Sequence, residues 1–300
     1  MKRTLFCSIA LSVIWHLSAL AFADHSKGTR TTAEELIAKA REAIGGEAKL
    51  KSIKSLSVTG SYRRNLGERE IGGEIEFEIL LPDKIRRVET MSPVPSAEIT
   101  RIDVMNGTQI WSDSQSSNTG GGMIMIRRPG ADTPQGQASA DNALRADLAR
   151  FLLGLLLAAP STFPLEFTFA GEAEAPDGRA DTLDVSGPNG FAARLFLDQK
   201  THRPLMMSYK DRAQRMVFQT ATGGPANRED MERRAREATA GAEAAPRVEV
   251  QLSLEDYRPV DGVMFPHSMS RMVDGKVNEE IEIKKIRVNP QIKPDRFEKK

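Results

Sequence analysis

The chain has 300 residues, and 42 Lys+Arg against 41 Asp+Glu give it a formal net charge of +1. This balance excludes a nucleic-acid partner that is attracted by the charge of the whole chain. With 40% hydrophobic residues, the composition is that of a globular protein and not of a disordered or polytopic membrane chain. Four histidines and one cysteine argue against a His- or Cys-rich centre. We therefore expect no metal, no cofactor and no nucleic acid.

The first 23 residues are typical of an export signal. Basic residues precede an apolar run (residues 5–20), and residues 21–23 (AFA) match the small-x-small cleavage pattern. We predict cleavage after Ala23, a polar tether over residues 24–31, and a periplasmic or otherwise exported protein. An uncleaved anchor is the alternative, although a bilayer needs about 20 apolar residues. Because Cys7 lies inside the signal, the mature chain must fold without disulfides.

After the tether, the pattern predicts one helix and then many strands. Thr31 or Thr32 can cap the helix, apolar residues follow at helical spacing up to Ile44, and Gly45-Gly46 end it. A short second turn covers residues 47–53. From there the apolar period becomes two, most clearly over residues 74–79 (EIEFEI). The predicted strands cover residues 56–62, 74–79, 84–90, 98–105, 109–112, 123–127, 165–169, 182–185, 191–197, 205–209, 215–218, 248–255, 263–269 and 277–288.

A second helix is predicted over residues 141–159, capped by Ser139 or Asp141. Its last nine residues, 151–159, are all non-polar, too few to span a membrane, which indicates a helix that enters a core. Loops are expected over residues 112–122 and 129–139. The charged, Ala-rich residues 223–246 are expected to form a helical or disordered insertion.

Short turns separate the strands, among them Asn106-Gly107, Asp261-Gly262 and Asp274-Gly275, so the sheet must be antiparallel. A sheet of about eleven strands, each with one polar and one apolar face, must curl around something. We therefore expect an α+β fold: a single domain over residues 32–300, built as a strongly curved open half-barrel whose helices cover the concave side.

Three motifs carry a resemblance to a known family. They are residues 45–56 (GGEAKLKSIKSL) after the first helix, residues 197–204 (LDQKTHRP) between two strands, and residues 256–266 (DYRPVDGVMFP). With the export signal and the order of elements, they resemble the periplasmic lipoprotein-carrier superfamily, the LolA/LolB-like proteins. The resemblance implies an eleven-stranded half-barrel around a hydrophobic cavity that holds acyl chains. The insertion at residues 223–246 departs from the family pattern.

The apolar inward positions are the expected ligand contacts. A closed core and a lipid cavity use the same residue types, so simple packing is the alternative for each of them; a large curved sheet over two helices favours a cavity. Met123 to Ile126 either touch a membrane as a loop tip or pair with residues 109–112. The predicted cavity residues are Phe77, Ile79, Phe151, Leu152, Leu155, Phe167, Phe169, Met207, Phe218 and Leu252.

Catalytic patterns are absent from the sequence. Neither H-E-x-x-H nor G-x-S-x-G occurs, and His202 and His267 are placed as turn or surface residues. Glu74, Glu76 and Glu78 share one strand face, which we interpret as its solvated side. We expect a binding protein that is not an enzyme, holding a lipid or the acyl chain of a lipoprotein. The alternative is an envelope sensor or interaction module that contacts a membrane-associated protein through residues 223–246.

Overall fold

The computed structural model describes residues 32–299, except 67–68, 95–96, 119–122, 128–133, 176–177, 213–216, 222–232 and 234–245. The predicted signal peptide and tether, and all of the insertion but two of its residues, therefore lie outside the described residues. The described residues all belong to one compact unit, Thr31–Lys300.

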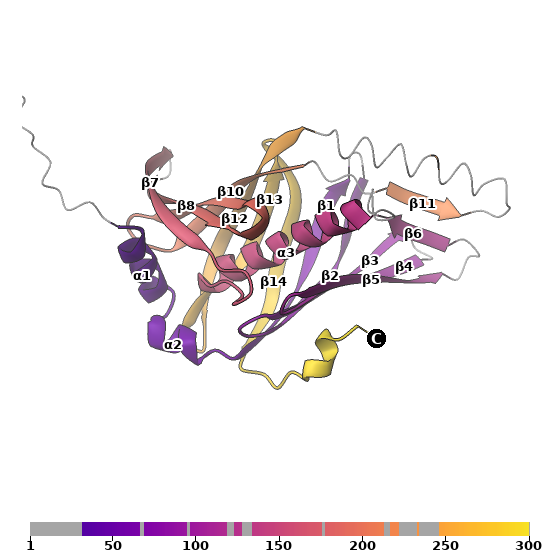
Figure 1. Cartoon of the computed structure of the whole chain (residues 1–300), viewed down its shortest axis with the longest axis horizontal. Helices are drawn as coiled ribbons and strands as arrows, with labels where there is room; N and C mark the ends of the chain where they lie inside the picture. Colours follow the sequence, from indigo (N-terminus) through magenta and orange to yellow (C-terminus); the bar gives the residue numbers. More distant parts are fainter. Residues whose placement is uncertain are drawn as a thin grey trace, which may run out of the picture. The chain divides into compact units, whose positions relative to one another are not determined.

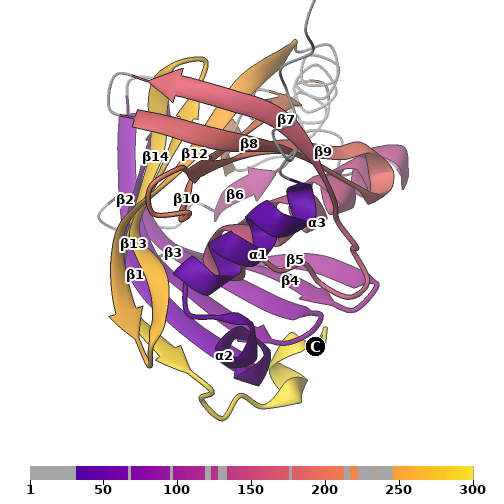
Figure 2. The same cartoon turned by 90° about the vertical axis from the view of Figure 1, so that its left-hand side faces the viewer.

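One antiparallel sheet of twelve strands forms the body of this unit, where a sheet of about eleven strands is expected. Its order is β5-β4-β3-β2-β1-β14-β13-β12-β10-β9-β8-β7, so β5 and β7 are edges and the sheet is not closed. The expected half-barrel is confirmed, and Figure 2 shows the sheet curling around α1 and α3. The strands of this sheet are β1 (Ser55–Leu66), β2 (Arg69–Leu80), β3 (Lys84–Val94), β4 (Ala97–Asn106), β5 (Gln109–Asn118), β7 (Glu166–Ala175), β8 (Gly178–Gly187), β9 (Phe191–Asp198), β10 (Pro204–Arg212), β12 (Arg247–Val260), β13 (Val263–Val273) and β14 (Lys276–Val288).

Two further strands form a separate small sheet. They are β6 (Met123–Arg127) and β11 (Val217–Ala221), which pair in antiparallel fashion. Residues 123–126 thus form the expected strand, but the expected pairing with residues 109–112 is wrong. Residues 109–112 instead open β5, which continues to Asn118 and occupies much of the predicted loop at 112–122.

The N-terminal helices follow the sequence prediction. Thr32 caps α1 (Ala33–Ala43) through a capping box with Glu35, and the apolar face of α1 is buried. Gly45 and Gly46 then adopt positive φ values of 141° and 89°, which only glycine tolerates readily, before α2 (Glu47–Ser52). Two short 3-10 helices, η1 (Pro188–Gly190) and η2 (Pro294–Phe297), complete the helical elements of the described chain.

The long helix α3 (Pro134–Leu156) lies along the concave side of the sheet (Figure 1). It begins seven residues before the predicted start, since Pro134 lies at its first position, where proline is well tolerated. Residues 148–156 are buried on every side of the helix. Leu148, Leu152 and Leu155 pack in one apolar core with β1, β2 and β13, while Ala149 and Leu153 pack in a second core with α1 and β9. The predicted entry of this segment into a core is confirmed.

Candidate functional site

The concave face of the sheet changes from apolar to charged along its strands. On β1, the inward positions begin with Leu56 and Val58 and end with Arg64, which is 8% exposed. On β3, Glu89 shares the inward face of Ile85 and is 2% exposed. Because side chains on a strand alternate between faces, these charges point to the side that the apolar core occupies. The predicted separation into one polar and one apolar face is therefore wrong for this part of the sheet.

These inward charges bind one another. The Arg64 guanidinium donates two hydrogen bonds of 3.2 and 3.3 Å to the Glu89 carboxylate, and its Nε donates to Glu279 at 2.6 Å. Arg87 Nη2 donates to Asp103 at 2.6 Å. Such charge-assisted bonds are needed because unpaired buried charges are strongly destabilising. We call this set the inner charge network; its members are Arg64, Arg87, Glu89, Arg101, Asp103 and Glu279.

The network keeps its members ionised. Burial alone would raise the pKa of Glu89, but Arg64, Arg87 and Arg101 outweigh burial and lower that pKa to about 2. Burial alone would likewise lower the pKa of Arg64, yet Glu89 and Glu279 outweigh it and raise that pKa. Glu89 therefore remains a carboxylate at neutral pH, unable to donate a proton to a bound molecule.

A second charged group lies nearby and contains two arginines with few partners. Arg150 of α3 pairs with Asp147 at 3.1 Å and lies over the ring of Tyr209, 3.7 Å from its centroid. Arg271 of β13 reaches Asp211 only at 3.8 Å, beyond hydrogen-bond distance. Burial raises the pKa of Tyr209, so its hydroxyl stays protonated at neutral pH. Although Arg150 precedes the non-polar run 151–159, its side chain is only 9% exposed.

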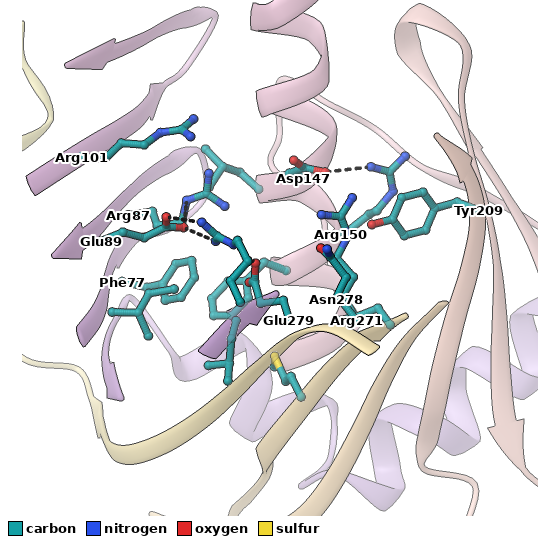
Figure 3. A pocket seen from close by; sticks show the side chains of 17 residues that line it. Phe77, Arg87, Glu89, Arg101, Asp147, Arg150, Tyr209, Arg271, Asn278 and Glu279 are labelled. Carbon is teal, nitrogen blue, oxygen red and sulfur yellow. Dashed lines mark hydrogen bonds and ion pairs between the residues drawn. The ribbon is translucent and has the colours of Figure 1, made fainter. Parts of the chain in front are cut away.

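Both groups line one cavity of about 110 Å³. Its apolar wall comes from β2, α3, β12, β13 and β14, and its polar wall contains five arginines against three carboxylates. Figure 3 shows Arg87, Glu89 and Arg101 on one side and Asp147, Arg150 and Tyr209 on the other, with Glu279 between them. The apolar wall consists of Ile75, Phe77, Leu148, Phe151, Leu252, Met269 and Ile281.

Three of the ten predicted cavity residues, Phe77, Phe151 and Leu252, line this cavity. The rings of Phe77 and Phe151 stack, with centroids 3.7 Å apart and planes inclined by 12°. Of the others, Ile79, Leu152 and Leu155 are buried in the core that contains this stack, Met207 is buried in the second core, and Phe167 packs partly buried against the second core. Phe169, on the edge strand β7, is 39% exposed and lies apart from the cavity. Phe218 lies on β11, and its side chain is outside the described residues.

The arginines of the polar wall are not among the residues predicted from the sequence. Arg87 and Arg101 each lie two positions after a buried isoleucine of the same strand, Ile85 and Ile99. Because residues two apart on a strand face the same side, this spacing could have identified both arginines as inward-facing. Among the described residues, no three His, Cys, Asp or Glu side chains gather as a metal site, and no helix is long and apolar enough to cross a membrane.

Comparison with known proteins identifies similar folds only. No family model and no curated protein matches the chain. A DUF1329 family protein from Desulfovibrio piger superposes with a TM-score of 0.48 at 9% identity, covering 89% of this chain and 97% of its own. A putative outer membrane lipoprotein-sorting protein domain from Vibrio parahaemolyticus gives 0.46 at 10%, with 88% and 97% covered. A LolA superfamily protein from Nitrosomonas europaea gives 0.43 at 12%, with 90% and 98% covered.

Proposed function

We propose that the protein is an exported binding protein that holds an apolar ligand, a lipid or the acyl chain of a lipoprotein, inside the half-barrel without chemical turnover. The observation that carries the proposal is the position of α3. This helix is buried on all sides in its C-terminal half and fills the concave side of an open sheet. Apart from Arg150, the buried half of this helix is non-polar and offers the sheet the same kind of surface as an alkyl chain.

The contacts of α3 support its replacement by a ligand. Its stack on Phe77 and its packing in both cores are apolar and non-directional, so a chain of methylene groups can take their place. Its hydrogen bonds to other elements include one near its middle, where Arg145 donates to Thr108 O at 2.8 Å, and one just past its C-terminus, where Arg41 donates to Leu157 O at 2.9 Å. We therefore propose that α3 is held near Arg145 and at Leu157, and that a ligand displaces the apolar side chains between these two points.

The cavity supports the same proposal. Its volume of about 110 Å³ is of the order of several water molecules, too little for a whole acyl chain. It borders the Phe77–Phe151 stack, so separation of these rings would extend it into the apolar core. Ligand entry then consists of widening an existing space.

Native mass spectrometry combined with lipid extraction tests the proposal. The chain is expressed with its signal, purified from the envelope of the host, and measured without detergent. We expect one lipid or acylated peptide per chain, and a lower occupancy in Phe151→Asp than in the surface control Phe169→Asp, because Phe169 is 39% exposed. A mass without adduct, both as purified and after incubation with phosphatidylglycerol vesicles, would overturn the proposal and favour an interaction module.

A further inference from the structure

We infer that Arg150, Arg271 and Tyr209 form a headgroup site for an oxyanion, so that the ligand class is an acidic amphiphile: an alkyl chain that ends in a carboxylate or phosphate. This inference rests on the proposed function and narrows it. It concerns the polar end of the cavity, where the buried Arg150 and the partly buried Arg271 lie beside the apolar wall.

Arg150 retains unused hydrogen-bond donors. A guanidinium has five N–H donors, and within the described chain Arg150 makes one hydrogen bond, from Nη1 to Asp147. Its Nε is buried without a hydrogen-bond partner, although the side chain is only 9% exposed. The Tyr209 ring covers one face of the guanidinium and fixes its plane. The in-plane donors are thereby held in place for an acceptor.

Arg271 also retains unused hydrogen-bond donors. Its side chain is 17% exposed, its Nε is buried without a partner, and its one ion pair, to Asp211, spans 3.8 Å. Buried polar groups are almost always hydrogen-bonded, so two such nitrogens in one cavity indicate that an acceptor is missing. An oxyanion can accept two or more N–H bonds at once, and arginine matches its geometry.

The remaining arginines of the cavity do not compete for this role. Arg64 is held by Glu89 and Glu279, and both Arg87 and Arg101 are held by Asp103, at 2.6 to 3.3 Å. The carboxylates that face the proposed site are Asp147, Asp211 and Glu279, of which Glu279 is already bound to Arg64. Glu89, Asp147 and Glu279 line the cavity with the five arginines, and Asp103 and Asp211 pair with Arg87, Arg101 and Arg271, so the site offers an oxyanion N–H donors and not a net positive charge.

The apolar neighbours distinguish an amphiphile from a free anion. Phe151, Leu252 and Met269 line the same cavity as Arg150 and Arg271. A free phosphate would make no apolar contact with the cavity side of these residues, whereas an alkyl chain that follows the headgroup would pack against it. Asp147, whose side chain is 20% exposed, lies beside the headgroup site, so the polar end is also the end nearer to solvent.

Calorimetry measures the affinity of four probes for the chain purified from the host envelope: dodecyl phosphate, dodecanoate, dodecanol and inorganic phosphate. The two alkyl acids are kept below their critical micelle concentrations and dodecanol below its solubility limit. We expect one acid per chain, bound at least about tenfold more tightly than dodecanol, as charge-assisted bonds to a buried site require. The acid that binds more tightly identifies the headgroup of the ligand as a phosphate or a carboxylate.

The variants separate the headgroup from the chain. Arg271→Gln should remove the preference for acids and leave dodecanol binding unchanged. Arg150→Lys keeps a positive charge beside Asp147 but lacks the guanidinium Nε. We expect this variant to bind the acids with a weaker preference over dodecanol and to retain the thermal midpoint of the wild type. Arg194→Gln is the control, because Arg194 pairs with Asp184 on an exposed surface.

Three results would overturn the inference. Equal affinities for dodecanol and both acids would remove the headgroup site but leave the proposed function standing. Inorganic phosphate bound as tightly as dodecyl phosphate would replace the amphiphile with a free anion. If none of the alkyl probes binds, this inference and the proposed function both fail.

Discussion

Phe151 of α3 stacks on Phe77 of β2, with ring centroids 3.7 Å apart, at the border between the apolar core and the cavity. The contact joins the only long helix of the described chain to the concave face of the sheet. It fills, with the protein's own side chains, the place that the proposed ligand would occupy. Stability and binding should therefore be coupled at this contact.

The first prediction concerns the energy of this stack. Phe77→Ala and Phe151→Ala should each lower the free energy of unfolding by about 3–5 kcal/mol, since both rings are buried. The double variant should lose less than the sum, with a coupling of about 0.5–1.5 kcal/mol. Urea titration measures all four states. Phe169→Ala, at an exposed position, should change stability by no more than about 0.5 kcal/mol, and strict additivity would contradict the stack.

The second prediction concerns acid stability. The pKa of Glu89 is about 2 in the folded chain and about 4.5 when it is unperturbed. A lowered pKa stabilises the fold fully above the unperturbed value, and this contribution of about 3 kcal/mol is lost as the pH falls from about 5 toward 2. Glu89→Gln should therefore destabilise the chain at pH 7, and the difference from wild type should shrink on acidification.

Urea unfolding at pH 7, 5, 4 and 3 measures this difference. Asp184→Asn is the control, because the Asp184–Arg194 pair is about half exposed and is screened by solvent. A difference between wild type and Glu89→Gln that stays constant from pH 7 to 3 would show that Glu89 is not held as a carboxylate by the inner charge network.

The third prediction concerns the junction between the last strand and the first. Asn289 follows β14 with φ = 54°, and its Oδ1 accepts the backbone N–H of Lys54 at 2.6 Å and of Ser55 at 3.3 Å. Asn289→Ala should cost about 2 kcal/mol, from lost hydrogen bonds and an unfavourable left-handed backbone. Asn289→Gly also loses the hydrogen bonds but tolerates the positive φ, so it should lower the stability by less than Asn289→Ala. Equal thermal midpoints of both variants would rule out a backbone contribution.

The fourth prediction concerns the attachment of α3. Arg41 of α1 donates from Nε and Nη2 to the carbonyl oxygen of Leu157, just past the C-terminus of α3. A cation at this end of a helix stabilises it. Arg41→Ala should accelerate both amide hydrogen exchange over residues 148–157 and ligand uptake. Lys51→Ala is the matched control, because Lys51 shares the partner Glu47 with Arg41 and is 75% exposed. Unchanged exchange in α3 would remove Arg41 as a restraint.

Local sequence chemistry was enough to predict much of the fold. The alternation over residues 74–79 lies inside β2, and Asp261-Gly262 adopts positive φ at both positions, as a tight hairpin requires. The non-polar end of the second helix is buried as expected. In each case the signal is contained in a few neighbouring residues.

The features that were missed depend on distant partners. The pairing of β6 with β11 joins residues about ninety positions apart, and nothing in either strand specifies the other. The first turns of α3 are polar and show no apolar period before Leu144. Arg150 and Arg271 come together only because α3 crosses the concave face beside β13, so their place in one cavity follows from topology and not from sequence spacing.

The account can be tested most directly by locating a bound alkyl chain. Crystals of the chain grown with 12-bromododecanoate would reveal the end of the chain through the anomalous scattering of bromine. The account predicts a carboxylate at Arg271 and Arg150, with bromine inside the half-barrel beyond separated rings of Phe77 and Phe151. Bromine on the outer face of the sheet, or a ligand bound while these rings remain stacked, would contradict it.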